Sequence, residues 1–333
     1  MFYEPYSRRG ERRERARERR GCAPRALWFL CKLALKLAVL VLVLALVAFA
    51  LPPGLFNVEP QTDLSIAAGL PDSHVNILVL GVDEDRGNSQ RSDSMMILSV
   101  GYNSVKLTSI LRDTVVNIEG HGQSKINAAY AYGGAELAMR TVNQAFGMNI
   151  SKYVVVSYQA LAKLVDAVGG IDIVISEEEM NHININTAPY ASMEGAEEYL
   201  GYPVERLTQY SADGETPVHL NGLYALNYAR IRKLDSDFTR TSRQRRVVQA
   251  VLASMRAHLA NPAMYVKIFD VLKNNVNTNM NVVEIVSLGM KALVHGEIEQ
   301  MRLPVDGTYN DNGSSISIDV AANAAALRAF IYG

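Results

Sequence analysis

Two apolar runs near residue 90 enclose a short and densely charged segment. Asn76–Leu80 and Met95–Val100 have the composition of buried strands. The segment between them carries Asp83, Asp85, Arg86, Arg91 and Asp93. Carboxylates and guanidinium groups crowded between two buried strands are costly to hold together unless a ligand shares their site. Because a divalent cation suits the aspartates and a multiply charged phosphate suits the arginines, we expect a site for both here.

An apolar segment lies upstream, from Leu27 to Leu51, and is followed by Pro52-Pro53-Gly54. It is long enough, at about 20 residues, to cross a bilayer as a helix. Lys32 and Lys36 lie near its N-terminal side, where their stems can reach the interface. Arginines crowd the first 25 residues, so the positive-inside rule places the N-terminus in the cytoplasm. We expect a cytoplasmic basic tail at 1–26, a transmembrane helix at 27–53, a linker at 54–73 and an extracytoplasmic domain at 74–333. A cleaved signal peptide is the alternative, but the apolar core is long for one and no clear A-x-A site follows.

Cysteine and histidine usage narrows the chemistry of the outer domain. The two cysteines are Cys22 and Cys31, both within the basic tail or the apolar segment. The outer domain must therefore be held by its core, without disulfides, and thiol catalysis is disfavoured. The six histidines are scattered without the spacing of zinc ligands. The tail lacks the pattern of a DNA-binding fold, so we expect no nucleic-acid partner.

Hydrophobic periodicity predicts alternating strands and helices in the outer domain. The predicted strands are 74–80, 94–100, 105–110, 153–157, 171–175, 228–231 and 298–303. The predicted helices are 125–132, 134–146, 158–168, 220–227, 241–259, 264–274, 282–295 and 320–332, the last capped by Asp319. This alternation indicates an α/β fold, an α-β-α sandwich with a mixed central sheet, preceded by one transmembrane helix. Residues 177–218 are acidic and irregular, and we expect a long surface excursion there. A lid or acceptor-binding rim and an insertion without a catalytic role are equally compatible with it.

Further arginines lie where predicted elements begin or end. Arg112-Asp113 follows the strand 105–110, and Arg230 and Arg232 have the period-two spacing of one strand face. Arg240, Arg243 and Gln244 open the helix 241–259 at spacings that form one stripe. Arginine grips phosphate oxygens bidentately, so the group suits a ligand with two linked phosphates. Surface ion pairs of little energetic value are the alternative for each residue taken singly.

The chain resembles the LytR–CpsA–Psr family over about residues 74–310. The resemblance is carried by the runs NILVLGVDEDRG, RSDSMMILSV, LTSILRDT, KINAAYAYGG, YVVVSYQALAKLVDAVGGIDI, LNGLYALNYARIRKLDSDFTRTSRQR and RLPVDGTY. It implies a membrane-anchored α/β enzyme of a Gram-positive-type envelope. Such an enzyme moves a glycopolymer from undecaprenyl pyrophosphate to peptidoglycan and releases undecaprenyl phosphate. Val82 and Leu111 depart from the family pattern, where threonine and proline are common, without removing a charged group.

The resemblance also implies roles for individual residues. The counterparts of Asp83 and Asp93 are associated with Mg²⁺. The counterparts of Arg91, Arg112, Arg230, Arg232 and Arg240 contact the pyrophosphate, with that of Gln244 nearby. We expect the catalytic group to comprise Asp83, Arg91, Asp93, Arg112 and Asp113, with Asp83 and Asp113 as the two candidates for the base that deprotonates the acceptor.

The lipid of such a carrier needs an apolar channel. The helices 134–146, 158–168 and 282–295 carry enough aliphatic residues to line one, with Val142, Phe146, Leu161 and Val165 as examples. Ordinary core packing is the alternative for each of these four. Two other functions stay open: a non-catalytic envelope regulator or receptor that binds polyprenyl pyrophosphates, and a polyprenyl-pyrophosphate pyrophosphatase.

Overall fold

The computed structural model describes residues 63–83, 91–232, 234, 236–295 and 297–333. The predicted basic tail and the predicted transmembrane helix at 27–53 lie outside these residues. The linker predicted at 54–73 is described only from residue 63 on. Among the described residues, none of the helices has the length and apolar character that crossing a bilayer requires.

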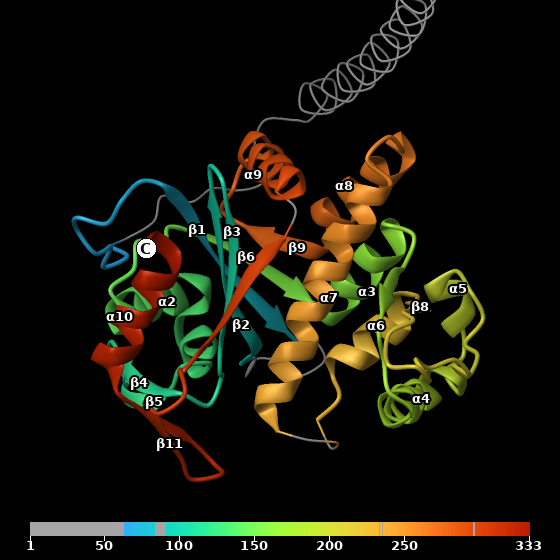
Figure 1. The fold of residues 1–333 in the computed structure, drawn as a ribbon, viewed down its shortest axis with the longest axis horizontal. Coiled ribbons are helices and arrows are strands. Elements are labelled where there is room, and N and C mark those ends of the chain that lie inside the picture. The colour runs from blue at the N-terminus through green and yellow to red at the C-terminus, as the bar shows by residue number, and fades with distance from the viewer. Residues whose placement is uncertain (1–62, 84–90, 233, 235, 296) are drawn as a thin grey trace, which may run out of the picture. The chain divides into compact units, whose positions relative to one another are not determined.

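A mixed sheet of six strands forms the centre of the fold (Figure 1). Its order is β10 (Ile298–Leu303), β3 (Val105–Ile110), β2 (Ser92–Gly101), β1 (His74–Val82), β6 (Lys152–Ser157) and β9 (Val276–Thr278). β1 pairs in parallel with β6, and β3 with β10, whereas the other neighbours are antiparallel. β10, β3, β1 and β6 therefore point the same way, and their carboxyl ends share one edge of the sheet, where β2 begins. The predicted mixed sheet is confirmed.

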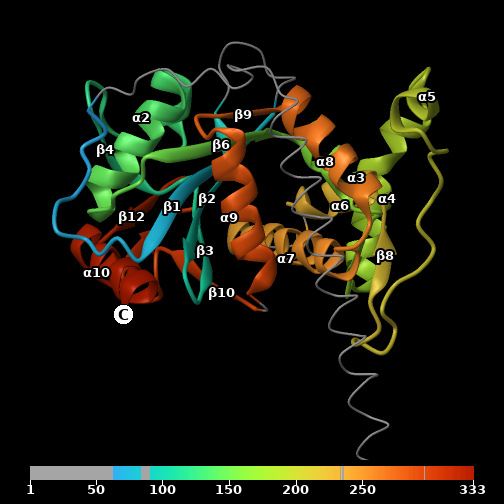
Figure 2. The ribbon, with the colours of Figure 1, turned by 90° about the horizontal axis from the view of Figure 1, so that it is seen from above.

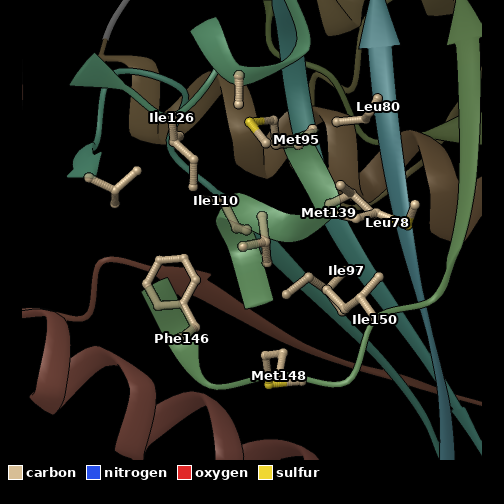
Figure 3. Packing of buried hydrophobic residues seen from close by; sticks show 14 of the residues in the cluster. Leu78, Leu80, Met95, Ile97, Ile110, Ile126, Met139, Phe146, Met148 and Ile150 are labelled. Atoms are coloured by element: carbon tan, nitrogen blue, oxygen red, sulfur yellow. The ribbon is translucent and has the colours of Figure 1, made fainter. Parts of the chain in front are cut away.

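Helices cover both faces of the sheet, as the predicted sandwich requires (Figure 2). α2 (Ala128–Phe146) and α10 (Val320–Tyr332) pack on one face, and α7 (Asp237–Ala257) and α9 (Val282–Val294) on the other. The core under α2 includes Leu78, Leu80, Met95, Ile97 and Phe146, all essentially buried (Figure 3). These strand residues alternate along β1 and β2, so the strand period places them on one face of the sheet.

A second core lies on the α7 side of the sheet (Figure 1). It is built from α3 (Tyr158–Ala167), α4 (Glu177–Ala191), α6 (Gly222–Ala229), α8 (Pro262–Asn275) and the hairpin of β7 (Ile171–Ile173) with β8 (Val218–Leu220). Leu220, Tyr228 and Val247 are buried within it. This second core supports α6 and α7, which position Arg230, Arg232 and Arg240.

We expected a long irregular excursion at 177–218. This expectation is wrong for the first part of the segment, which folds into α4 and the short α5 (Ala196–Leu200). Ser176 and Glu179 form a capping box, since each side chain bonds the backbone N–H of the other. Met180, Ile183 and Thr187 then provide a narrow buried stripe. This stripe is interrupted by polar residues, which is why the periodicity is weak in the sequence.

Two further expectations are wrong. Tyr228–Ile231 is not a strand, because Tyr228 and Ala229 complete α6 and Ile231 follows its last turn. Lys125 does not begin a helix but ends a hairpin of β4 (Val115–Ile118) with β5 (Gly122–Lys125). Short strands of this kind carry too few residues for their period to be visible.

The cap predicted for the last helix is confirmed, since the Asp319 carboxylate accepts from Ala322 N at 3.0 Å. We expect Asp319→Ala to lower the free energy of unfolding by about 1 kcal/mol, the usual loss for an N-cap. Chemical denaturation of both forms measures this difference. Asp319→Asn is the matched control, because asparagine caps equally well, and a similar loss in that variant would contradict the capping role.

Candidate active site

The carboxyl-end edge of the sheet gathers charged residues from three strands. Asp83 directly follows β1, Asp93 is the second residue of β2, and Arg112-Asp113 lies just beyond β3. Val82 pairs with Ser92, so Asp83 and Asp93 come from neighbouring strands at the same edge. Ligands of open α/β sheets bind at the carboxyl ends of the strands. The fold thus brings together residues that the sequence places up to thirty positions apart.

Asp93 is the buried centre of this group. Its Oδ1 accepts from Arg112 Nη1 at 2.7 Å and from Arg232 Nη2 at 2.9 Å, and its Oδ2 accepts from the Tyr158 hydroxyl at 3.0 Å. Burial, together with the neighbouring Asp93 carboxylate, raises the pKa of Tyr158 to about 12. The phenol therefore stays protonated and holds the carboxylate in place.

Arg230 and Arg232 reach the group from the end of α6, and not from a strand as expected. Arg230 is the C-cap residue of that helix, and its guanidinium stacks over the Tyr158 ring at 4.7 Å from the centroid. Arg232 lies two residues further on and bonds Asp93. Both side chains reach the site as expected, but the end of a helix brings them there and the predicted strand is wrong.

Arg240 contributes from the first turn of α7 and is only 2% exposed. Its Nη2 donates to Asp237 Oδ2 at 2.9 Å and to the Asp93 carbonyl oxygen at 3.3 Å. Its Nε and Nη1 have no hydrogen-bond partner among the described residues. Burial lowers the pKa of Arg240 to about 10. The nearby Arg112 and Arg232 also lower this pKa, whereas Asp237 raises it. The guanidinium is therefore still a cation at neutral pH. A buried cation with two unsatisfied nitrogens is a strong indication of an anionic ligand.

A pocket of about 760 Å³ opens beside these arginines. Its lining includes Tyr158, Arg230, Arg232, Arg240 and Gln244, together with residues of α4 and α6. Gln244 accepts from Ser94 Oγ at 3.0 Å, which ties α7 to β2. The volume is that of a site for a small organic ligand.

Other predicted residues are placed differently. Arg243 does not share the stripe of Arg240 and Gln244, because its Nε donates to the buried Glu179 at 2.7 Å. It lines a second pocket, of about 510 Å³. Arg91 is exposed just before β2 and does not line the larger pocket. Asp113 bonds Lys125 Nζ at 2.8 Å and lies 3.4 Å from Arg112 Nε.

The model of the LytR_cpsA_psr family matches residues 57–329. This chain belongs to that family. It is 36% identical over 217 residues to the polyisoprenyl-teichoic acid–peptidoglycan teichoic acid transferase TagU of Oceanobacillus iheyensis, covering 62% of this chain and 59% of TagU. It is 28% identical over 272 residues to the regulatory protein MsrR of Staphylococcus aureus strain COL, covering 78% of this chain and 75% of MsrR.

The fold of this LytR–CpsA–Psr protein also matches solved structures. One is the family protein YwtF (TagT) with bound octaprenyl pyrophosphate lipid, at a TM-score of 0.57 and 18% identity, covering 82% of this chain and 92% of that one. At that identity the likeness establishes the fold alone. The alignment with TagU spans about three fifths of the length of TagU. The family and the α/β fold expected from the sequence are both confirmed.

The four residues expected to line a lipid channel are not brought together. Val142 and Phe146 are fully buried in the core beneath α2, whereas Val165 is buried in the second core with Leu161 packed against it. None of the four lines either pocket described above. The arrangement favours core packing for these side chains over a shared lipid surface.

The carboxylates of Asp83 and Asp93, where we expect a metal site, are ligands of the kind that Mg²⁺ takes. Both carboxylates are buried at adjacent strand ends, and Mg²⁺ is commonly held by one or two carboxylates plus substrate phosphates. No group of three or more His, Cys, Asp or Glu side chains that could hold a metal occurs in the described part of the chain. Phosphate oxygens would therefore have to complete the coordination.

Tyr158 is a site residue that the sequence reasoning missed. The available indication was its position directly after β6, at the edge where the other site residues lie. We expect Tyr158→Phe to lower the rate of the catalysed reaction about tenfold, because a hydrogen bond to a carboxylate is lost while the ring beneath Arg230 stays. Tyr158→Leu should lower it further, since Arg230 then loses its stacking partner as well.

Steady-state kinetics of both variants, together with their affinity for inorganic diphosphate, test this positioning role. Tyr202→Phe is the control, because that phenol bonds Asp166 at 3.1 Å, away from the arginines. Equal activity of wild type and Tyr158→Phe would show that the hydroxyl has no part in holding Asp93.

Proposed function

We propose that this chain transfers a glycopolymer from a polyprenyl-diphosphate carrier onto a sugar hydroxyl of peptidoglycan. Teichoic acid, a capsular glycan or a related phosphate-linked polymer would be the group moved. The observation that carries the proposal is Arg240, a buried guanidinium with two nitrogens that lack a partner among the described residues, in a pocket that Arg230 and Arg232 also line. The names of two relatives support the reaction and the carrier: TagU is a teichoic acid transferase, and the YwtF structure holds octaprenyl pyrophosphate.

The proposed reaction is a displacement at the phosphorus nearer the glycan. The acceptor oxygen forms a new P–O bond, the bond from that phosphorus to the bridging oxygen breaks, and polyprenyl phosphate leaves. The product is a phosphodiester, and the hydroxyl proton passes to a base at the sheet edge. Arg112, Arg232 and Arg240 would neutralise the charge that builds on the bridging and leaving oxygens.

Asp83 and Asp113 are the two carboxylates at this edge that we consider for the base. Asp113 holds Lys125 and faces Arg112, so both of its oxygens already lie near a cation. Asp83 is buried at the end of β1. Single-turnover rates of Asp83→Asn and Asp113→Asn, measured with saturating donor over a range of pH and of Mg²⁺ concentration, assign the role. Loss of the base slows the chemical step and removes its dependence on pH, whereas loss of a metal ligand is offset by added Mg²⁺.

Mg²⁺ is part of the proposal, with Asp83 and Asp93 as its protein ligands. When bound, it would supply positive charge to the diphosphate oxygens. Arg112, Arg232 and Arg240 would hold and orient the diphosphate, so the metal and these arginines would act on one anion. We also propose an N-terminal cytoplasmic tail and a single membrane-spanning helix at 27–53. They would hold the outer domain at the surface where the carrier lipid and peptidoglycan meet.

Incubation of the full-length chain with a radiolabelled polyprenyl-diphosphate-linked glycan, peptidoglycan and Mg²⁺ tests the function. We expect label to move onto peptidoglycan and polyprenyl phosphate to be released in equal amount. Release of polyprenyl phosphate without an acceptor would instead identify a pyrophosphatase and refute the transferase.

The name of MsrR, a regulatory protein, favours one alternative, a receptor for polyprenyl diphosphates without catalytic turnover. Both functions require the arginine cluster, so binding alone does not separate them. Tight binding of the labelled donor with no release of polyprenyl phosphate, in the presence of acceptor and metal, would support the receptor. Stoichiometric transfer of the label excludes it.

A further inference from the structure

One stripe of α4 and of the turn after it, here called the α4 stripe, lines the same pocket as the arginines. His182, Ile185, Asn186, Pro189, Tyr190 and Met193 line it. Their spacings of three and four residues place them along one side of the helix and the turn that follows it. The cavity is continuous from this stripe to Arg230, Arg232 and Arg240. Whatever is covalently attached to a diphosphate on those arginines therefore begins beside α4.

The stripe is not needed to hold α4 in the fold. The helix packs against α6 and buries Met180, Ile183 and Thr187 on a different side. Ile185 and Met193, by contrast, are 64% and 54% exposed. Large apolar side chains left open beside a charged pocket indicate a surface for a ligand.

The chemistry of the stripe is mixed. Hydrogen-bonding groups of His182, Asn186 and Tyr190 alternate with the apolar Ile185, Pro189 and Met193. Asn186 makes a long bond, 3.4 Å from its Nδ2 to the Asn227 carbonyl oxygen, and its side-chain Oδ1 is a further hydrogen-bond acceptor. An isoprenoid chain is apolar along its whole length and gives such polar groups nothing to bond. A sugar ring offers both an apolar C–H face and a rim of hydroxyl groups.

We propose that the α4 stripe binds the glycan of the donor, at the first sugars attached to the diphosphate. This inference rests on the proposed function and adds a subsite to it. Tyr190 would supply an amphipathic ring for a sugar face, and Asn186 and His182 would bond hydroxyl groups. The stripe then selects which glycopolymer enters the site, while the arginines hold the diphosphate that all such donors share.

The test measures how the full-length chain binds two ligands that differ only in the sugar. One is farnesyl diphosphate and the other is farnesyl diphosphate linked to N-acetylglucosamine, each titrated by calorimetry. We expect Tyr190→Ala to weaken binding of the sugar-bearing ligand about tenfold, and Asn186→Ala about fivefold, from the loss of one stacking and one hydrogen-bonding contact. Binding of farnesyl diphosphate should change by less than about twofold in both variants.

Asn181→Ala is the matched control, since Asn181 is an exposed asparagine of the same helix that does not line the pocket. It should bind both ligands as wild type does. Equal weakening of both ligands by Tyr190→Ala would assign the stripe to the lipid or the diphosphate and overturn the inference. So would unchanged binding of both together with a raised KM for peptidoglycan, which would assign it to the acceptor. If the wild-type chain binds neither ligand, the proposed function itself fails, which is a separate result.

Discussion

Replacing Arg112 by alanine is expected to lower the rate of glycan transfer by about a thousandfold. Arg112 lies at the end of β3 and reaches Asp93 at 2.7 Å, Asp113 at 3.4 Å and Asp237 at 3.6 Å. Burial by itself would lower the pKa of Arg112, but Asp237, Asp113 and Asp93 together raise the pKa above its usual value, so the guanidinium stays charged. In the proposed reaction this charge faces the oxygens on which negative charge develops. Single-turnover assays with saturating donor measure the loss in the chemical step.

Two variants give this experiment its controls. Arg112→Lys keeps the charge but not the planar fork, and we expect it to recover only part of the rate. Arg206→Ala removes an exposed arginine that does not line the pocket and should leave transfer unchanged. A folded Arg112→Ala protein that transfers glycan at the wild-type rate would remove Arg112 from the mechanism.

The second large effect concerns Asp93, whose replacement by alanine should destabilise the fold as well as the site. The buried carboxylate accepts from Arg112, Arg232 and Tyr158, so its loss leaves crowded cations without their counter-charge. Removing one partner of a buried ion pair costs about 3–5 kcal/mol. We expect the midpoint of thermal unfolding to fall by about 10 °C, given the usual shift per kcal/mol for a domain of this size.

An added anion distinguishes this electrostatic cause from a simple packing defect. Inorganic diphosphate should raise the unfolding midpoint of Asp93→Ala more than that of wild type, because it replaces the missing negative charge. Asp172→Ala is the control, since Asp172 pairs with His219 at an exposed position and contributes little. A midpoint of Asp93→Ala that does not respond to diphosphate would contradict an anion site at the cluster.

The sequence predicted the fold well where its elements are long and periodic. The strands at β1, β2, β3, β6 and β10 and the helix α10 were expected within a few residues of where they lie. It failed at α4, whose buried stripe of Met180, Ile183 and Thr187 is interrupted by polar residues, and at the hairpin of β4 with β5. Those elements are stabilised by a capping box and by neighbouring elements, which a local pattern does not reveal.

The candidate site was likewise predictable from the sequence only in part. The sequence by itself determined which charged groups stand at the ends of strands, because the period of a buried strand fixes where polar residues can begin. Only the tertiary structure decided how they are used. Arg240 and Gln244 face the pocket while Arg243, between them on the same helix, turns to Glu179. Glu179 lies on α4, far away in the sequence, and a buried guanidinium must pair with whatever carboxylate the fold brings to it.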